Sequence, residues 1–398
     1  MACPNKLNSN NFEIYYTEQT GQYWCDGESV IPANPVFTRL DTDGGTPITN
    51  AEASRSKALN GGREYTDIRI ISELVGYSMA TKFKYGVHDK FLEYVFQSSF
   101  SAGAVISGKE ISIDAATKTL TIAGEDLTTT IPVGSLIALP SATGKNKEGM
   151  RVIASSFAAD TVLTVAPASL DNKLVSETVT TDIRLPNILK VGTEQKWFAL
   201  LVVHNDIETE DKYQLIYDCQ VNSFSTEAAV NSDMTATFDI FGGYSMAGIP
   251  LPTGATLEDF TFYDKLVAAD GGVYHGDKRI SFVESMSMTL DGGGSQALEL
   301  GSKYATSVDW ASAVENDFTI NAYMLNWDRQ KSMTAEEEGV YYFTASFAGN
   351  AIGITYPNAR ITGIDRTVGE GSIQENLTVS PRAKDGETSM LIMTVSSN

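Results

Sequence analysis

Alternation of apolar and polar residues dominates the chain and predicts β-strands. The pattern is clearest at 110–124 and 198–206, and it returns at 280–292 and 388–397. Val, Ile, Thr, Phe and Tyr are frequent in these runs, while Gly, Asn and Asp separate them, as is typical of strands and turns. The pattern therefore predicts a mainly β protein.

Helical spacing of apolar residues is confined to three short stretches. At 88–100 four apolar residues fall on one face, and Asp89 precedes them as a suitable N-cap. The stretch 306–317 has a similar pattern, and 256–270 is a third candidate. We therefore expect a few short helices beside the strands.

A long hairpin without catalytic residues is predicted at 217–242. Two alternating runs flank a polar turn, which lies at 227–233. One face carries Val221 and Phe238, suited to a core, and the other carries small polar residues. A similar hairpin recurs at 358–383, which raises the question of an internal repeat.

Order and spacing suggest that one β unit occurs twice. The strand from Arg69 resembles the one from Arg279, and the helix ending at Phe100 matches one ending at Phe318, offsets of 210 and 218. The final hairpins, from Cys219 and Ala359, are only 140 apart, so the first copy holds 218 − 140 = 78 additional residues. We expect a first unit at 1–102 and 191–248, an inserted β module at 103–190, and a second unit at 249–398.

Composition excludes several classes of function. The 398 residues are enough for two or three domains. A net charge of −21, from 29 Lys+Arg and 50 Asp+Glu, argues against binding nucleic acid or anionic membranes, both of which need basic surface. No apolar run is long enough to span a bilayer, and the N-terminus lacks a signal-peptide pattern. Three widely spaced Cys form neither a disulfide framework nor a zinc motif.

Candidate chemistry is sparse. Residues 39–46 hold a fragment of a calcium loop without its later ligands, and 290–296 is Gly-rich but lacks the Lys of a phosphate loop. Acidic clusters at 205–212 and 334–342 could supply a carboxylate pair for glycoside hydrolysis, although charge runs on loops are usually solvated. We predict no enzyme activity, no cofactor and no metal site.

The order of these segments resembles the major tail tube proteins of long-tailed bacteriophages. The resemblance is carried by "AEASRS" at 51–56, "DKFLEYVF" at 89–96, "WFALLVV" at 197–203 and the two long hairpins, the second preceded by Pro357. The inserted block is similar to a β module common within that family. The resemblance covers nearly the whole chain and rests on pattern and order.

This resemblance implies two tandem tube-type β-sandwich or barrel domains, the first with an inserted and external β module. It implies that open strand edges, hairpin 217–242 among them, pair with the next subunit, and that three two-domain chains form a pseudo-hexameric ring. Rings would stack into a tail tube, assembled in the host cytoplasm, with 1–35 and 40–66 as candidate stacking segments. Expected partners are further copies of the chain, a tape-measure protein, tail terminator and tip proteins, and double-stranded DNA passing transiently through an acidic lumen, with no membrane.

The resemblance also suggests where the functional residues lie. Candidate lumen or inter-subunit strand residues are Asn222, Thr235, Thr237, Asp239, Thr362 and Thr378. Candidate residues of an acidic lumen or inter-ring loop are Asp206, Glu208, Glu210 and Asp211. Two alternatives remain open: an all-β virion or surface module that recognises a glycan, and a hydrolase that uses two carboxylates.

Overall fold

The structure is a computed structural model that describes residues 12–56, 67–169, 173–260, 264–310, 313–369, 371–384 and 386–397. These residues form mainly strands, with three short α-helices, which confirms the predicted fold class. The helices are α1 (Tyr23–Asp26), α2 (Asp89–Phe96) and α3 (Asp328–Thr334). The N-terminal part of the predicted arm, residues 1–11, lies outside the described residues.

The first half of the molecule comprises β1–β4, α1, α2 and β11–β16. Its outer sheet runs in the order β3–β4–β14–β13, and the start of β13 turns away to pair with β12 and β15. Its strands are β1 (Phe12–Glu18), β2 (Val36–Arg39), β3 (Ile48–Ser56), β4 (Asp67–Lys82), β11 (Asn187–Lys190), β12 (Phe198–His204), β13 (Tyr213–Ala229), β14 (Thr235–Gly242), β15 (Ser245–Ile249) and β16 (Thr256–Glu258).

The second half comprises β17–β26 and α3. Its outer sheet runs β19–β22–β25–β24, and the start of β24 pairs with β23 and β26. Its strands are β17 (Gly271–His275), β18 (Lys278–Arg279), β19 (Val283–Asp291), β20 (Ser295–Leu298), β21 (Ala305–Asp309), β22 (Glu315–Tyr323), β23 (Gly339–Phe347), β24 (Asn350–Gly369), β25 (Ser372–Pro381) and β26 (Leu391–Ser396).

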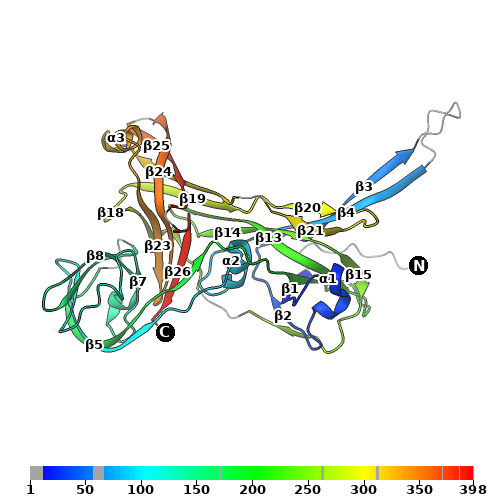
Figure 1. Ribbon diagram of the computed structural model, residues 1–398, viewed down its shortest axis with the longest axis horizontal. Helices are drawn as coiled ribbons and strands as arrows, with labels where there is room; N and C mark the ends of the chain where they lie inside the picture. The colour runs from blue at the N-terminus through cyan, green and yellow to red at the C-terminus, as the bar shows by residue number, and fades with distance from the viewer. Residues whose placement is uncertain are drawn as a thin grey trace.

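A separate β module stands between α2 and β11 in the chain. Its six strands form their own sheet in the order β10–β5–β6–β9–β8–β7, around a core that includes Ile111, Leu120 and Leu163. In Figure 1 it lies at one end of the molecule, below β23 and β24. Its strands are β5 (Val105–Asp114), β6 (Thr119–Ile122), β7 (Leu136–Ile137), β8 (Met150–Phe157), β9 (Thr161–Pro167) and β10 (Glu177–Arg184).

Two predicted helices are wrong. The stretch 306–317 contains parts of β21 and β22, and 256–270 contains β16 and a short 3₁₀ turn at Ala268–Asp270. The first error has a clear cause: Val308 pairs with Gln296 across a two-stranded arm, and the Trp310 ring packs beside Gly292 and Gly294. Tertiary contacts therefore override a short helical spacing of apolar residues.

Helix α2 is where predicted, and it fills the first half. Phe91 and Phe96 are fully buried on its inner face. The Phe91 ring lies 5.4 Å from Phe198, edge-on, and 5.7 Å from Phe238, tilted, so the helix joins β12 to the outer sheet through aromatic contacts.

The module is fastened to the second half by buried polar contacts. Arg151 is fully buried, donates to Thr344 Oγ1 at 3.1 Å and lies 4.0 Å over the Tyr342 ring. Beside it, the Ser346 hydroxyl donates to Glu148 at 2.7 Å and accepts from Gly149 N at 2.9 Å. The module thus braces β23, although its sequence interrupts the first half.

Replacing Arg151 by Ala should lower the free energy of unfolding by about 3 kcal/mol, because it leaves a cavity and removes the buried hydrogen bond to Thr344. Chemical denaturation measures the change. Lys145→Ala is the control, because that side chain is 47% exposed and should matter little. Equal effects of the two substitutions would contradict this account of the module.

His88 should make the protein less stable in mild acid. Burial lowers its pKa from 6.5 to about 4, so the folded protein keeps the imidazole neutral while the unfolded chain takes up a proton. The contribution of neutral His88 to the free energy of unfolding is therefore complete well above pH 6.5. It is lost progressively as the pH drops toward 4, with a loss of about 2 kcal/mol at pH 5. Denaturant titrations at pH 7.5 and 5 should show that His88→Leu lacks this loss; an identical loss in the variant would refute it.

Candidate functional site

One continuous sheet passes through both halves of the molecule. Strand β13 of the first half pairs antiparallel with β19 of the second, from Ser223 opposite Asp291 to Ala229 opposite Ser285. The joined sheet therefore has eight strands in the order β3–β4–β14–β13–β19–β22–β25–β24. Figure 1 shows β13, β14 and β19 running across the middle of the molecule.

The inward face of this sheet is apolar. Met79, Phe224, Phe238, Leu290 and Ile320 are fully or almost fully buried. Met79, Phe238, Phe224 and Leu290 lie opposite one another on successive strands, and Ile320 lies opposite buried Met286, so one core crosses the junction between the halves. This burial fixes the register, because a slip by one residue would turn every apolar side chain outward.

The side chains of the other face are mostly small and polar or acidic, and we refer to this face as the polar face. Its charged residues include the carboxylates of Glu227, Asp239, Asp291, Glu315, Asp317 and Asp365, with the cations Lys82 and Arg360 at its margins. Its uncharged polar residues include Ser78, Ser223, Ser225, Thr235, Thr237, Ser285, Ser287, Thr289, Thr319, Asn321, Asn376, Thr378 and Thr367.

The charge of the polar face is negative over most of its width. Lys82 approaches Asp43 at 3.8 Å and Asp233 at 3.7 Å, so its charge is compensated locally. Asp239 accepts a 2.8 Å hydrogen bond from Ser223 across the strands. The side chains of this face are short, and its carboxylates attract cations and repel phosphate.

The six predicted strand residues lie on or beside this face. The register places Thr235, Thr237, Asp239 and Thr378 on the polar face. Asn222 and Thr362 occupy β-bulges at matching points of the two hairpins. The Asn222 side chain accepts from Gly294 N at 2.7 Å, and Thr362 bonds Ser380 at 2.7 Å.

The predicted acidic loop lies elsewhere. Asp206, Glu208, Glu210 and Asp211 are exposed in the turn between β12 and β13. That turn precedes Tyr213, whereas the polar face begins on β13 at Ser223, about 30 Å further along an extended strand. The structure therefore does not bring the loop together with the strand residues.

The open edges also differ from the expectation for hairpin 217–242. Strand β14 is paired on both sides, and the end of β13 is paired with β14 and β19 of the same chain. Among the described residues, the joined sheet ends instead at β3, which pairs only with β4, and at 363–369 of β24, which pair only with β25. Apolar residues are exposed there, with Ile48 at 61% and Val368 at 78%.

The acidic cluster at 334–342 forms surface ion pairs. Glu336 lies 2.9 Å from Arg360, and Glu338 pairs with Arg382 and, at 3.0 Å, with Lys384. Hydrogen bonds from Lys384 and Arg382 lower the pKa of Glu338, which is unsuited to a general acid. Asp41, from the calcium-like fragment, lies 2.5 Å from Lys84.

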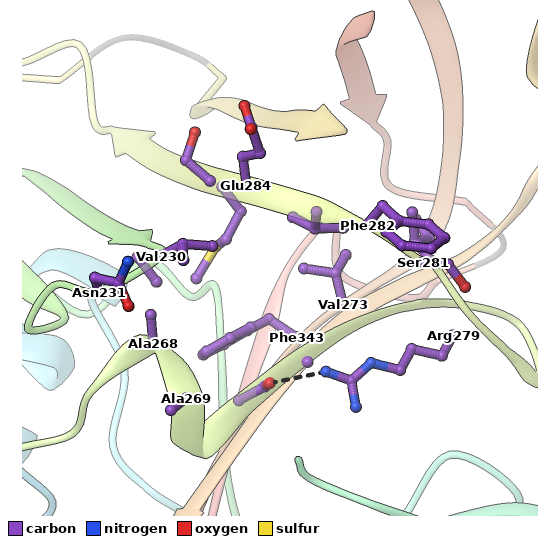
Figure 2. Close-up of a pocket in the computed structure, with 17 residues that line it drawn as sticks. Val230, Asn231, Ala268, Ala269, Val273, Arg279, Ser281, Phe282, Glu284 and Phe343 are labelled. Carbon is purple, nitrogen blue, oxygen red and sulfur yellow. Dashed lines mark hydrogen bonds between the residues drawn. The ribbon is translucent and has the colours of Figure 1, made fainter. Parts of the chain in front are cut away.

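A cavity of about 560 Å³ lies between β17 and β19 (Figure 2). Val230, Val273, Phe282 and Phe343 supply an apolar lining, and Arg279 donates to the Gly271 carbonyl at 3.3 Å rather than into the space. Sugar recognition needs several convergent hydrogen-bonding groups. The polar residues Asn231, Ser281 and Glu284 of this lining lie at separate places around the cavity in Figure 2.

Comparison with protein families supports the structural interpretation. The phage tail tube protein family matches residues 14–381 of the chain. The chain belongs to this family. No curated protein matches the sequence.

Membership of this family agrees with a mainly β molecule that is built around a sheet. It also implies that the protein is a virion tail component with a structural role. In the part of the chain that the structure describes, no helix is both long and apolar enough to cross a membrane. Within the same residues, no cluster of His, Cys, Asp and Glu is arranged to hold a metal ion.

Proposed function

We propose that this tail tube protein is a self-assembling structural subunit whose rings stack into the phage tail tube and conduct DNA. The observation that carries the proposal is the joined sheet: one strand junction is closed inside the chain, and two edges are left open at opposite ends. A surface in which one end complements the other end of an identical molecule forms closed rings when the rotation permits.

Duplication of one tube unit supports this assembly. The order β3–β4–β14–β13–β12 in the first half parallels β19–β22–β25–β24–β23 in the second. A helix follows the second strand in each, α2 after β4 and α3 after β22. In this correspondence β4 matches β22, rather than β19 as the similarity from Arg69 to Arg279 suggests. We keep the proposed boundaries: 1–102 with 191–248, the inserted 103–190, and 249–398.

Three chains suffice for a ring that admits DNA. Three chains of eight strands contribute twenty-four strands to a closed barrel. Strands about 4.8 Å apart then give a circumference of at least about 115 Å and a backbone diameter of at least about 37 Å. Side chains on both walls leave roughly 25 Å, which is wide enough for a duplex.

The polar face would line this bore. Its carboxylates and short hydroxyl side chains repel the phosphate backbone within a Debye length of about 8 Å, so DNA slides without being held. A basic wall would instead bind DNA by releasing counterions. The acidic loop 205–212, away from this face, would serve contacts outside the bore.

The remaining projections suit contacts with further virion components. The hairpin of β3 and β4 extends far from the body in Figure 1, and its Ile68, Ile70 and Ile71 are exposed, as expected of a contact between stacked rings. The module would face the exterior. Tape-measure, terminator and tip proteins are the proposed partners along and at the ends of the tube, in a siphovirus-like tail assembled in the host cytoplasm.

Negative-stain electron microscopy of the purified protein tests the assembly. We expect rings or hollow tubes, alone or after addition of a tail-tip initiator, with threefold symmetry in averaged end views. A protein that remains a monomer under all these conditions, or rings without threefold symmetry, would refute the proposal.

Lysines placed on the polar face should make the tube hold DNA. Ser225→Lys with Thr319→Lys adds two positive charges per chain near the middle of the joined sheet. Tubes of this variant should sediment with a short duplex about tenfold more at 50 mM than at 200 mM salt, while wild-type tubes retain little. Thr178→Lys with Thr180→Lys, exposed on the module, is the charge-matched control. Equal retention by variant and control would contradict a lumen-facing polar face.

A further inference from the structure

The closed junction between β13 and β19 gives a template for the open one. At this junction seven residue pairs run antiparallel, with buried Phe224 opposite Leu290 and, on the polar face, Ser225 opposite Thr289. If the halves are repeats, the junction between two chains should use the counterparts of these strands. This step rests on the function proposed above.

The counterpart of β13 in the second half is fixed by a shared irregularity. The β13–β14 ladder has a bulge between Val221 and Ser223, and the β24–β25 ladder has one between Ile361 and Gly363. Both positions differ by 140 residues (361 − 221 and 363 − 223). Residues 223–229 therefore correspond to 363–369, the stretch of β24 whose outer edge is open.

The counterpart of β19 follows through the neighbouring strands. Thr237 lies opposite Ala80, and at the same place in the second half Asn376 lies opposite Asn321. Ala80 bridges to Gly44, just as Asn321 pairs with Ser285. Residues 285–291 therefore correspond to 44–50, an offset of 241 (285 − 44), and this stretch forms the other open edge.

We propose that residues 363–369 of one chain pair antiparallel with residues 44–50 of the next copy, with Gly363 opposite Asn50 and Gly369 opposite Gly44. The register puts Ile364 opposite Thr49 on the inward face and Asp365 opposite Ile48 on the polar face. It covers Val368, which is 78% exposed in the single chain, with the backbone of Gly45. Pro47, opposite Arg366, supplies no N–H, so the ladder has one gap there, as an edge proline permits.

Side-chain contacts on the inward face fix the position of this edge of β24. Arg366 lies on the inward side of β24, where its guanidinium bonds the buried Glu375 at 3.0 Å and lies 5.0 Å from the Trp327 ring. Glu375 also bonds Arg329 of α3 at 3.0 Å. The edge strand is thus clamped from one face by α3 while its outer backbone stays accessible, as a strand that accepts a partner requires.

Engineered disulfides test the register. The background replaces Cys3 and Cys25 with Ser and keeps buried Cys219. To it we add Ile48→Cys with Asp365→Cys, which the register places directly opposite, at a Cα separation of about 5 Å that suits a disulfide. The matched control, Asn50→Cys with Asp365→Cys, uses the same face but is slipped by two residues, to roughly 7–8 Å or more.

Assembled, oxidised tubes of the first variant should give chains linked up to a covalent trimer on denaturing gels, about tenfold more than the control. Thr49→Cys with Ile364→Cys probes the inward face of the same register and should also cross-link. Tubes that are visible by microscopy but in which neither pair cross-links, or in which the slipped control cross-links as well as the first pair, would overturn the register and leave the proposed tube function intact. Failure of the unmodified protein to form tubes would count against the function itself.

Discussion

The antiparallel pairing of β13 with β19 is the interaction on which the rest of the structure depends. It joins two sheets into one, carries an apolar core across the boundary on one face, and continues the polar face on the other. Without it, two separate sandwiches would each expose a strand edge inside the chain, which is an aggregation hazard. The pairing removes one pair of edges and leaves one pair at the ends.

Burial on only one side of the joined sheet explains both its register and its chemistry. Phe224, Leu290 and Ile320 fix each strand, since a slip would expose them. The residues between them are then free of packing demands and need only suit what lies outside. These residues are mostly short polar and acidic side chains, an arrangement that packing does not impose and that suits the proposed passage of a polyanion.

Local periodicity in the sequence is enough to predict part of the structure. Alternation predicts the fold class and which residues of the long hairpins face the core, and helical spacing predicts helix α2. It cannot predict which strands become neighbours. The strand at 69–79 resembles the one at 279–288 in letters, yet the first pairs with β14 and the second with β13 and β22. The hairpin 217–242 looks like an edge for the same reason: alternation identifies faces, whereas edges depend on pairing between residues far apart. The helix expected at 306–317 fails because its first residues pair in β21 and the Trp310 ring packs beside Gly292 and Gly294, in the connection between β19 and β20.

The inserted module connects the two halves of the subunit. It leaves the first half after α2 and returns at β11, which itself pairs with β26 of the second half. Arg151 and Glu148 then tie it to β23 and the following turn through buried hydrogen bonds. Contacts between the two halves therefore include the joined sheet, the β11–β26 ladder, the module, and the β20–β21 arm, whose Gln296 donates to the carbonyls of Val75 and Gly242. In the proposed ring, closure would require a fixed angle between the two halves, because an error in that angle would be repeated at every subunit. The β13–β19 ladder alone would leave this angle free to change, and the β11–β26 ladder and the module restrain it.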